Sequence, residues 1–586
     1  MWRGVFYGRF ILKSFYIKLL SISIISCLGI LVYSNTFLCS FHFDDFTSIV
    51  ENLDIRYIHN LQNIWSFWPC RFLTYLSVAF NYHFNGLNVF GYHLFNLGVH
   101  LASAFLVWWL TLLTFSTPTM KEEKIARHAN LIALFVGLVF VSHPIQTQAV
   151  TYIVQRAASL ATLFYLASLS LYVKSRLLLK GNDTIKFYYI GSLITAIMAM
   201  FTKETAITLP LMILLYEVSF LKTKQSFNWG GLVPFLLTLF IIPLIMLFTK
   251  SVNFQEMHRV TEISPAISSM HYFLTQFRVM VTYIRLIFLP LNQNLDYDYP
   301  IFKNIFELPV LTSLLFLITI LFFTKRLFSK YRMVSFFILW FFLTLLPESS
   351  LLPIKDVIYE HRLYLPLVGY SMFLVSGAYY LFEKKTIGMM VMALIMVISC
   401  YSVLTYQRNK VWKDEVTLWD DAVGKSPHKT RPYNNRGNAY EGQGNFTQAM
   451  SDYNKAIAID PNYAMAYRNR GFSYAKQGNL TQAIADYNKA IAIDPKFATA
   501  YNDRGFSYAK QGNFTQAISD LAQAIEIDPK DAKAYYNRGL IYAQQGNFTK
   551  AMSDLAQAIE IDPNDAKAYY NRGLIYAQQG NFVQAI

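Results

Sequence analysis

Charged residues are scarce in this chain of 586 residues. Asp, Glu, Lys and Arg together make up 15% of it, against about 25% in a typical soluble domain. Hydrophobic residues supply 54% and aromatic residues 17%. The scarcity of charge argues against an ordinary soluble protein and predicts a polytopic membrane protein with a soluble part attached.

Familiar catalytic and metal-binding motifs are missing as well. The sequence contains no glycine-rich phosphate loop, no H-E-x-x-H and no Ser-His-Asp signature, so ATP-driven or zinc-driven chemistry has no motif support. The four cysteines include no C-x-x-C pair, which argues against a metal motif and against a disulfide framework. We expect no cofactor and name no metal ligands, and the metal requirement stays open.

The net charge of +15 raises the question of a nucleic-acid partner. Such binding would need Lys and Arg gathered on one polar domain. They lie instead mostly in short loops between apolar runs, where they set membrane topology. We therefore expect the lipid bilayer as a partner and no nucleic acid.

Residues 1–406 are predicted to form an all-α polytopic membrane domain. A span needs roughly 20 mostly apolar residues, and about eleven stretches qualify. They lie near residues 15–37, 93–116, 129–143, 157–174, 186–201, 205–221, 231–249, 306–324, 333–347, 363–382 and 387–406. The first follows a basic N-terminus without a clear small-x-small cleavage site, and we interpret it as an uncleaved span. The stretch 271–290 is either a further span or a helix in the membrane interface.

The loops between these spans fall into two classes. Basic clusters such as Lys121/Lys124/Arg127 and Lys325/Arg326/Lys330/Arg332 share one side if the eleven spans are right, and that side should be cytoplasmic. The other side then carries the polar loops and everything after the last span. Candidate site residues and the C-terminal domain are thus predicted to share the non-cytoplasmic face.

A 34-residue repeat begins near residue 430. Small residues where two helices cross, aromatics between them and a closing proline form the tetratricopeptide pattern. The recurring glycines are Gly437, Gly471, Gly505, Gly539 and Gly573. We predict a solenoid over 430–586, with units 430–463, 464–497, 498–531, 532–565 and an incomplete 566–586. Because the last unit stops inside its second helix, we expect a fragment or a contact there.

Two smaller features accompany the repeats. Residues 407–429 are predicted to form a linking helix between the two domains. The repeat turns also contain four N-x-T triplets, for which turn chemistry is the preferred interpretation over glycosylation. Their asparagines are Asn445, Asn479, Asn513 and Asn547.

An acidic pair, Asp44 and Asp45, follows the first span. A carboxylate can act as a general base when its neighbours tune its pKa, and two adjacent carboxylates repel unless a cation or hydrogen bond holds them. Taken alone, such a pair is more often a solvated helix end. Cations predicted on the same face suggest an anionic partner such as a phosphate. They are Arg71, Arg156, Lys203, Lys355 and Arg362.

The outer loops, taken in order, resemble those of a known family. The segments "FHFDD", "SHPIQTQAVTYIVQRAASLATLFYL", "FTKETAITLPLMILLYE", "LPLNQNLDYDY" and "YEHRLYLPLVGY" precede the repeats in this order. Together they resemble the transmembrane and tetratricopeptide-repeat O-mannosyltransferase family and its bacterial relatives, within the GT-C superfamily of glycosyltransferases. The resemblance covers nearly the whole chain.

This resemblance implies a fold and a reaction. The fold would be a GT-C-type membrane domain followed by helical repeats. The reaction would be an inverting transfer of a sugar from a polyprenyl phosphate to hydroxyls of protein acceptors that the repeat groove docks. An acidic residue of the first outer loop is the proposed base in such enzymes, which implies catalytic roles for Asp44 and Asp45.

The resemblance also implies residues for the donor phosphate. "EHRLYLP" implies Arg362 as a phosphate ligand with Glu360 nearby, although His361 stands between them where the family often has Glu directly before Arg. The segments "VQRAASL" and "TKET" imply Arg156 and Lys203 as further ligands of the donor phosphate. Glu204, Glu360, His143 and Arg71 are expected to support these residues, and a simple helix-capping role is equally open for His143.

Two alternatives remain at this stage. One is a GT-C enzyme with a lipid or cell-wall glycan as acceptor. The other is a non-catalytic membrane anchor that presents the repeats to protein partners, and it predicts that the outer loops tolerate substitution. The segment "HPIQTQAVTYIVQRAASL" is of the bacterial type, which favours a bacterial inner membrane with the site and the repeats on the periplasmic face.

Overall fold

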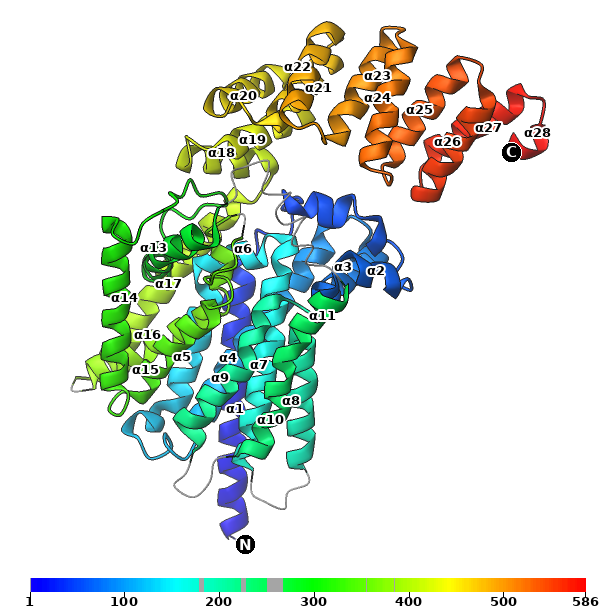
Figure 1. Cartoon of the computed structure of the whole chain (residues 1–586). Helices are drawn as coiled ribbons and strands as arrows, with labels where there is room; N and C mark the ends of the chain where they lie inside the picture. Colours follow the sequence, from blue (N-terminus) through cyan, green and yellow to red (C-terminus); the bar gives the residue numbers. More distant parts are fainter. Residues whose placement is uncertain are drawn as a thin grey trace. The chain divides into compact units, whose positions relative to one another are not determined.

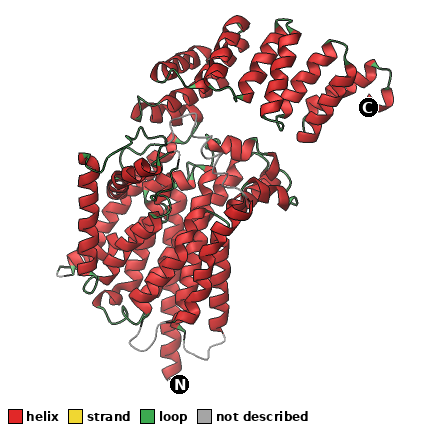
Figure 2. Ribbon diagram, in the orientation of Figure 1, coloured by secondary structure: helices red, strands yellow, loops and turns green. Residues whose placement is uncertain are grey.

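The computed structural model describes residues 2–178, 184–222, 228–249, 267–354, 356–383 and 385–585, with side chains from Phe15 onward. Within these ranges every regular element is a helix (Figure 2), which confirms the expected all-α class. The chain divides into two compact units, Met1–Leu418 and Trp419–Ile586. Lys355, one of the cations singled out from the sequence, lies outside the described residues.

The first unit consists of long helices joined by short ones. Its α-helices are α1 (Trp2–Val32), α2 (Leu61–Phe67), α3 (Phe72–Asn85), α4 (Val89–Phe115), α5 (Ala129–Ser142), α6 (Thr147–Val150), α7 (Arg156–Leu177), α8 (Thr184–Met200), α9 (Leu209–Tyr216), α10 (Trp229–Leu237), α11 (Ile241–Thr249), α13 (Ser269–Phe288), α14 (Leu308–Leu327), α15 (Arg332–Leu345), α16 (Pro366–Phe382) and α17 (Ile387–Val411). The helix α18 (Glu415–Lys425) follows, and the division between the units falls inside it.

Eight helical stretches in the described residues are long and apolar enough to cross a membrane. They are Phe15–Val32, Val89–Phe115, Lys124–Ser142, Ile153–Leu177, Glu204–Leu221, Trp229–Thr249, Leu308–Leu327 and Ile387–Val411. Each overlaps a span expected from the sequence. Three other expected spans coincide with the shorter apolar helices α8, α15 and α16.

The long helices of the first unit run side by side (Figure 1). α4 packs against α5 and α7, and α7 packs against α8. Small residues permit close approach where helices cross. A Cβ at Gly137 of α5 would lie 2.7 Å from the Ile25 side chain of α1.

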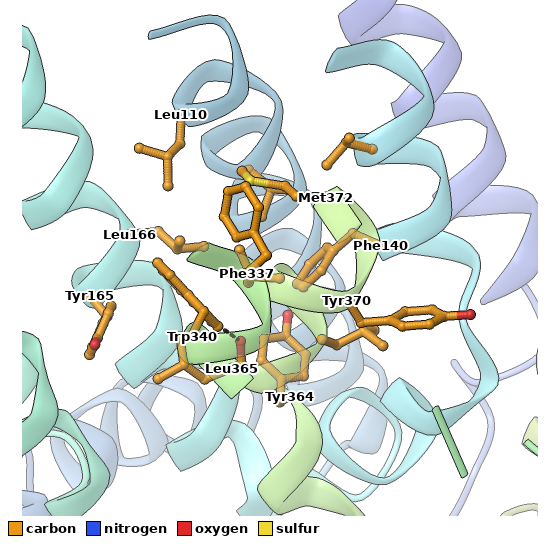
Figure 3. Close-up of a cluster of buried hydrophobic side chains, with 14 of the residues drawn as sticks. Leu110, Phe140, Tyr165, Leu166, Phe337, Trp340, Tyr364, Leu365, Tyr370 and Met372 are labelled. Atoms are coloured by element: carbon orange, nitrogen blue, oxygen red, sulfur yellow. Dashed lines mark hydrogen bonds between the residues drawn. The ribbon is translucent and has the colours of Figure 1, made fainter. Parts of the chain in front are cut away.

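Aromatic side chains fill the contact between α15 and α16. Phe337 and Trp340 lie beside the chain leading into α16, and the Trp340 indole N–H donates to the Leu365 carbonyl at 3.0 Å (Figure 3). A Cβ at Gly369 would lie 2.8 Å from the Phe337 carbonyl oxygen. A glycine is therefore required there by the close approach of the Phe337 backbone.

This contact predicts a position-specific loss of stability. Gly369→Val should unfold more easily than Gly377→Val in the same helix, because a Cβ at Gly377 meets no atom within 4 Å. Overpacking costs about 1–3 kcal/mol, and the helix-propensity change is the same at both sites. Thermal unfolding of the two variants in detergent measures the difference. Equal midpoints would contradict the tight contact.

One end of the first unit gathers basic loops. Lys124 pairs with Glu383 at 3.7 Å, and Arg176 pairs with Glu217 at 2.6 Å. These contacts join helix ends that are distant in sequence. The chain continues after Val32 from the opposite end of α1 (Figure 1).

The second unit is a row of helix pairs. Its helices are α19 (Thr430–Gly442), α20 (Phe446–Ile459), α21 (Ala464–Lys476), α22 (Leu480–Ile493), α23 (Ala498–Lys510), α24 (Phe514–Ile527), α25 (Ala532–Gln544), α26 (Phe548–Ile561), α27 (Ala566–Gln578) and α28 (Phe582–Ala585). Their packing follows the repeat: a Cβ at Gly437 would lie 2.6 Å from the Tyr453 ring of the paired helix. The second helix of four pairs begins with an asparagine of an N-x-T triplet, whose side chain accepts from the backbone N–H three residues on. The structure thus gives these asparagines a helix-capping role.

Candidate active site

The Asp44 loop (residues 40–45) follows α1, and its two carboxylates have different surroundings. Asp45 is fully buried, and its two oxygens accept from the backbone N–H groups of His42 (3.0 Å) and Val154 (2.7 Å). Asp44 is half-buried, and its own N–H donates to the Tyr152 hydroxyl at 2.9 Å. Asp45 therefore holds the loop together, whereas the Asp44 side chain stays partly exposed.

The electrostatics of Asp45 agree with a structural role. Burial raises its pKa to about 7. The hydrogen bonds from His42 and Val154 and the charge of His42 oppose this rise, whereas Asp44 adds to it. The hydrogen bonds to Asp45 thus offset the repulsion between the two neighbouring carboxylates.

Arg71 and Lys203 lie close to partners of opposite charge. Arg71, at the start of α3, makes a forked contact with Glu204, with Nη2 and Oε2 3.1 Å apart. Lys203 Nζ lies 3.2 Å from Glu348 Oε1, and both side chains are buried. The Arg71 guanidinium lies over the Trp68 ring, 4.4 Å from the ring centroid, and the Trp68 indole N–H donates to Glu204. Each cation therefore has a carboxylate that neutralises it.

Arg362 is held by the backbone of its own loop. Its guanidinium donates to the carbonyls of Val357 (3.1 Å) and Asp356 (2.9 Å) and is buried. Although burial opposes its charge, the pKa of Arg362 is raised, because Tyr283, Glu348 and Tyr272 lie nearby. A guanidinium that donates to carbonyls keeps its full positive charge for an anion.

The helix α13 supports this loop with its polar face. Gln276 donates to the Val357 carbonyl (3.0 Å), and the Tyr283 hydroxyl donates to the Tyr359 carbonyl (3.1 Å). The Tyr272 hydroxyl donates to the Glu348 carbonyl (2.6 Å). Sequence alone left α13 open between a span and an interfacial helix, and the structure shows that its buried polar groups fix the segment that carries Arg362.

Arg71, Lys203 and Arg362 form a cation cluster around His361. Burial lowers the pKa of His361 well below its usual value, and the charges of all three cations lower it further. The ring of His361 stacks on Tyr359 with centroids 5.1 Å apart, and the backbone N–H of His361 donates to Gln148 Oε1 (2.6 Å). Three loops that are far apart in sequence therefore bring their positive charges to one place.

Two tyrosines connect the Asp44 loop with this cluster. The pKa of Tyr152 is raised well above its usual value, first by burial and then by the charges of Asp44 and Asp45, with a small contribution from Tyr359. Tyr75 interacts electrostatically with Arg71 and also with Asp44. Asp44 and the cation cluster thus share neighbours.

The contacts of Arg156 that the structure describes are with residues outside the cation cluster. Its fully buried guanidinium donates to Asn81 Oδ1 (2.6 Å) and to the Tyr92 carbonyl (3.3 Å), and it lies over the Phe95 ring at 4.7 Å. These partners belong to α3 and α4. The described contacts of Arg156 join α7 to those two helices.

Glu360 and His143 hold loops in place. Glu360 is buried and accepts from Asn294 N–H (2.6 Å), Gln293 (3.0 Å) and the Tyr297 hydroxyl (2.6 Å). His143 Nε2 donates to the Ile287 carbonyl (2.8 Å) and its Nδ1 accepts from Ile145 N–H (3.2 Å). His143 thus has the capping role that was one of its two interpretations.

The structure adds residues that the sequence did not single out. Glu348 contacts Lys203, and the Tyr152 hydroxyl accepts from Asp44 N–H. Tyr283 exchanges hydrogen bonds with the backbone of Tyr359, near Arg362. No group of three or more His, Cys, Asp or Glu side chains that could hold a metal ion occurs in the part of the chain that the structure describes.

Known proteins match both units. Residues 437–478, 473–512, 507–546 and 539–580 match the family model of the TPR repeat. "Protein O-mannosyl-transferase Tmtc3" of Drosophila melanogaster is 27% identical over 511 residues, covering 73% of this chain and 54% of that protein. The human "Protein O-mannosyl-transferase TMTC3" is 26% identical, covering 72% of this chain and 50% of that protein. This chain is similar to these TMTC O-mannosyl-transferases over almost three quarters of its length.

The resemblance to this family is therefore confirmed. The chain spans about half the length of the curated relatives it matches. Among solved structures, the crystal structure of MamA is 30% identical over 25% of this chain and 87% of that chain, with a TM-score of 0.24.

Proposed function

We propose that this chain is a membrane glycosyltransferase that moves a sugar from a polyprenyl phosphate to hydroxyl groups of protein acceptors. The proposal rests on two observations. Tyr75 interacts electrostatically with both Asp44 and Arg71. The charges of Arg71, Lys203 and Arg362, which come from separate segments of the chain, all act on His361. The relation to O-mannosyl-transferases supports glycosyl transfer as the reaction class.

The proposed reaction is a direct displacement. Asp44 takes the proton from the acceptor hydroxyl as its oxygen attacks the anomeric carbon. The bond between that carbon and the phosphate oxygen breaks on the opposite face, so the anomeric centre inverts. Arg362, with Lys203 and Arg71, stabilises the negative charge that develops on the departing lipid phosphate. Asp45 keeps its loop in place, and Arg156 joins α7 to α3 and α4.

The cellular arrangement is part of the same proposal. The three shorter apolar helices join the eight longer ones as spans of a GT-C-type domain. The basic loops face the cytoplasm. Asp44, the cation cluster and the repeats face the periplasm of a bacterial inner membrane, where the repeat unit docks the acceptor.

Transfer from a labelled donor tests the proposal. Membranes that contain the full chain are offered polyprenyl phosphate carrying labelled mannose or another hexose, and label should appear in protein and resist removal of lipid. Label that enters only lipid or glycan would indicate the alternative acceptor. No transfer with any sugar offered would favour the non-catalytic anchor.

The docking role of the repeats makes a separate prediction. A chain of residues 1–429 should transfer sugar to a short Ser/Thr peptide at close to the full-length rate and to folded protein acceptors much more slowly. The expected reason is the loss of local acceptor concentration that a second binding module supplies. Comparing kcat/KM for both acceptors measures the effect, and equal rates on protein acceptors would rule out docking by the repeats.

A further inference from the structure

The segment 412–415, which leads from the end of α17 into the first residue of α18, is hydrogen-bonded to the Asp44 loop. Ser40 N–H donates to the Lys413 carbonyl (3.2 Å) and Phe43 N–H donates to Glu415 Oε1 (3.3 Å). The His42 ring lies between the two segments. Its Nδ1 is 3.0 Å from Glu415 Oε1, and its Nε2 is 2.7 Å from the Trp412 carbonyl oxygen. All these residues belong to the first unit.

Both ring nitrogens of His42 face oxygen atoms of the 412–415 segment. A carboxylate oxygen and a carbonyl oxygen only accept hydrogen bonds. The backbone N–H of His42 donates at the same time to Asp45. His42 therefore connects the 412–415 segment with the carboxylate that holds the loop.

The backbone of the loop is strained at its centre. Phe43 has φ +43°, in the left-handed region that bulky residues rarely adopt. Such a conformation persists where the surroundings hold it, and it is frequent at functional sites. Hydrogen bonds hold Phe43 on both sides: its own N–H donates to Glu415, and Asp44 N–H donates to Tyr152.

An aromatic stack completes the connection. The Tyr152 ring stacks on Trp412, with centroids 5.4 Å apart and planes at 25°. The Trp412 ring also meets His42 edge-on at 5.7 Å. The tyrosine that accepts from Asp44 N–H is thus itself held by the 412–415 segment.

We propose that Glu415 and Trp412 are positioning residues that keep Asp44 in the conformation needed for proton transfer. This inference rests on the proposed function, in which Asp44 is the base. Glu415 opens α18, the helix in which the first unit ends. The part of the chain that leads into the repeats therefore positions the proposed base, in addition to connecting the two units.

The test uses the full chain with a short peptide acceptor, so that docking on the repeats has little influence. Glu415→Ala should lower kcat on the order of 10–100-fold, because small misplacements of a catalytic group are costly, and leave KM for the donor near wild type. Glu415→Gln should recover most of the rate, since an amide oxygen can accept the same two bonds. Lys413→Ala is the matched control, because its side chain is exposed and only its carbonyl takes part.

Asp44→Asn, measured beside these variants, separates the two ideas. Loss of transfer in Asp44→Asn with Glu415→Ala behaving like Lys413→Ala would overturn the positioning role and leave the proposed function standing. Full transfer by Asp44→Asn would remove the base and with it the proposed function. If Glu415→Ala does not accumulate, Glu415→Asp decides: its carboxylate is withdrawn by one methylene, so a folded variant with wild-type kcat contradicts the inference. Equal losses in Ala and Gln variants would contradict its hydrogen-bond basis.

Discussion

Asp44→Asn is expected to reduce sugar transfer roughly 10²- to 10⁴-fold, the range that a general base contributes. The amide cannot take a proton from the acceptor hydroxyl, but it is almost the same size as the carboxylate. The fold should therefore persist. The measurement is the rate of label transfer from polyprenyl phosphate under saturating donor, with thermal unfolding in detergent recorded for the same preparation.

Asp45→Asn is the matched control for this prediction. Asp45 accepts two backbone N–H bonds in a buried place, and an amide offers only one oxygen for them. Leaving a buried N–H without a partner costs about 1–3 kcal/mol, so Asp45→Asn should lower stability more than Asp44→Asn does. Should Asp45→Asn remain stable and lose transfer while Asp44→Asn stays active, the two carboxylates have been assigned the wrong way round.

Arg362→Gln is expected to give the second large loss, on the order of 10²- to 10³-fold in kcat. This is the typical effect of removing one group that stabilises charge in the transition state. Arg362→Lys should retain part of the rate, because it keeps the charge and loses the planar fork. Single-turnover measurements with labelled donor separate this chemical step from product release.

The buried Arg156 provides a matched comparison for Arg362. Arg156→Gln removes bonds to Asn81 and Tyr92 that join α7 to α3 and α4. We expect it to reduce the amount of folded protein and its unfolding temperature. The kcat of the protein that does fold should change far less than in Arg362→Gln. The reverse pattern would transfer the phosphate role to Arg156.

The repeat unit was predictable because its rule is local. Glycine, tyrosine and proline recur at a fixed spacing, and the contact of Gly437 with Tyr453 involves neighbours within one unit. The apolar helices were predictable from length and hydropathy. Helix ends were less so, since α17 continues to Val411 although the apolar run ends near residue 406. Polar residues there extend the helix through contacts that hydropathy does not register, such as Asn409 donating to the Val32 carbonyl (3.2 Å).

Roles within the site depend on distant partners. Asp44 and Asp45 are neighbours with the same side chain, and the N–H of Val154 distinguishes them. The contacts of Arg156 are with α3 and α4, whereas Arg362 contacts the backbone of its own segment, and neither set of partners can be predicted from the neighbouring sequence. The sequence does not predict a role for Glu348, because no neighbouring residue indicates Lys203 as its partner.

The pairing of Lys203 with Glu348 and of Arg71 with Glu204 bears on turnover. An enzyme that binds an anionic leaving group tightly with bare buried cations would be inhibited by its own product. In the proposed reaction, Glu348 and Glu204 would replace the departing lipid phosphate as partners of Lys203 and Arg71. No buried cation would then be left without a counter-charge, so the proposed product would dissociate in exchange for a contact the protein already makes.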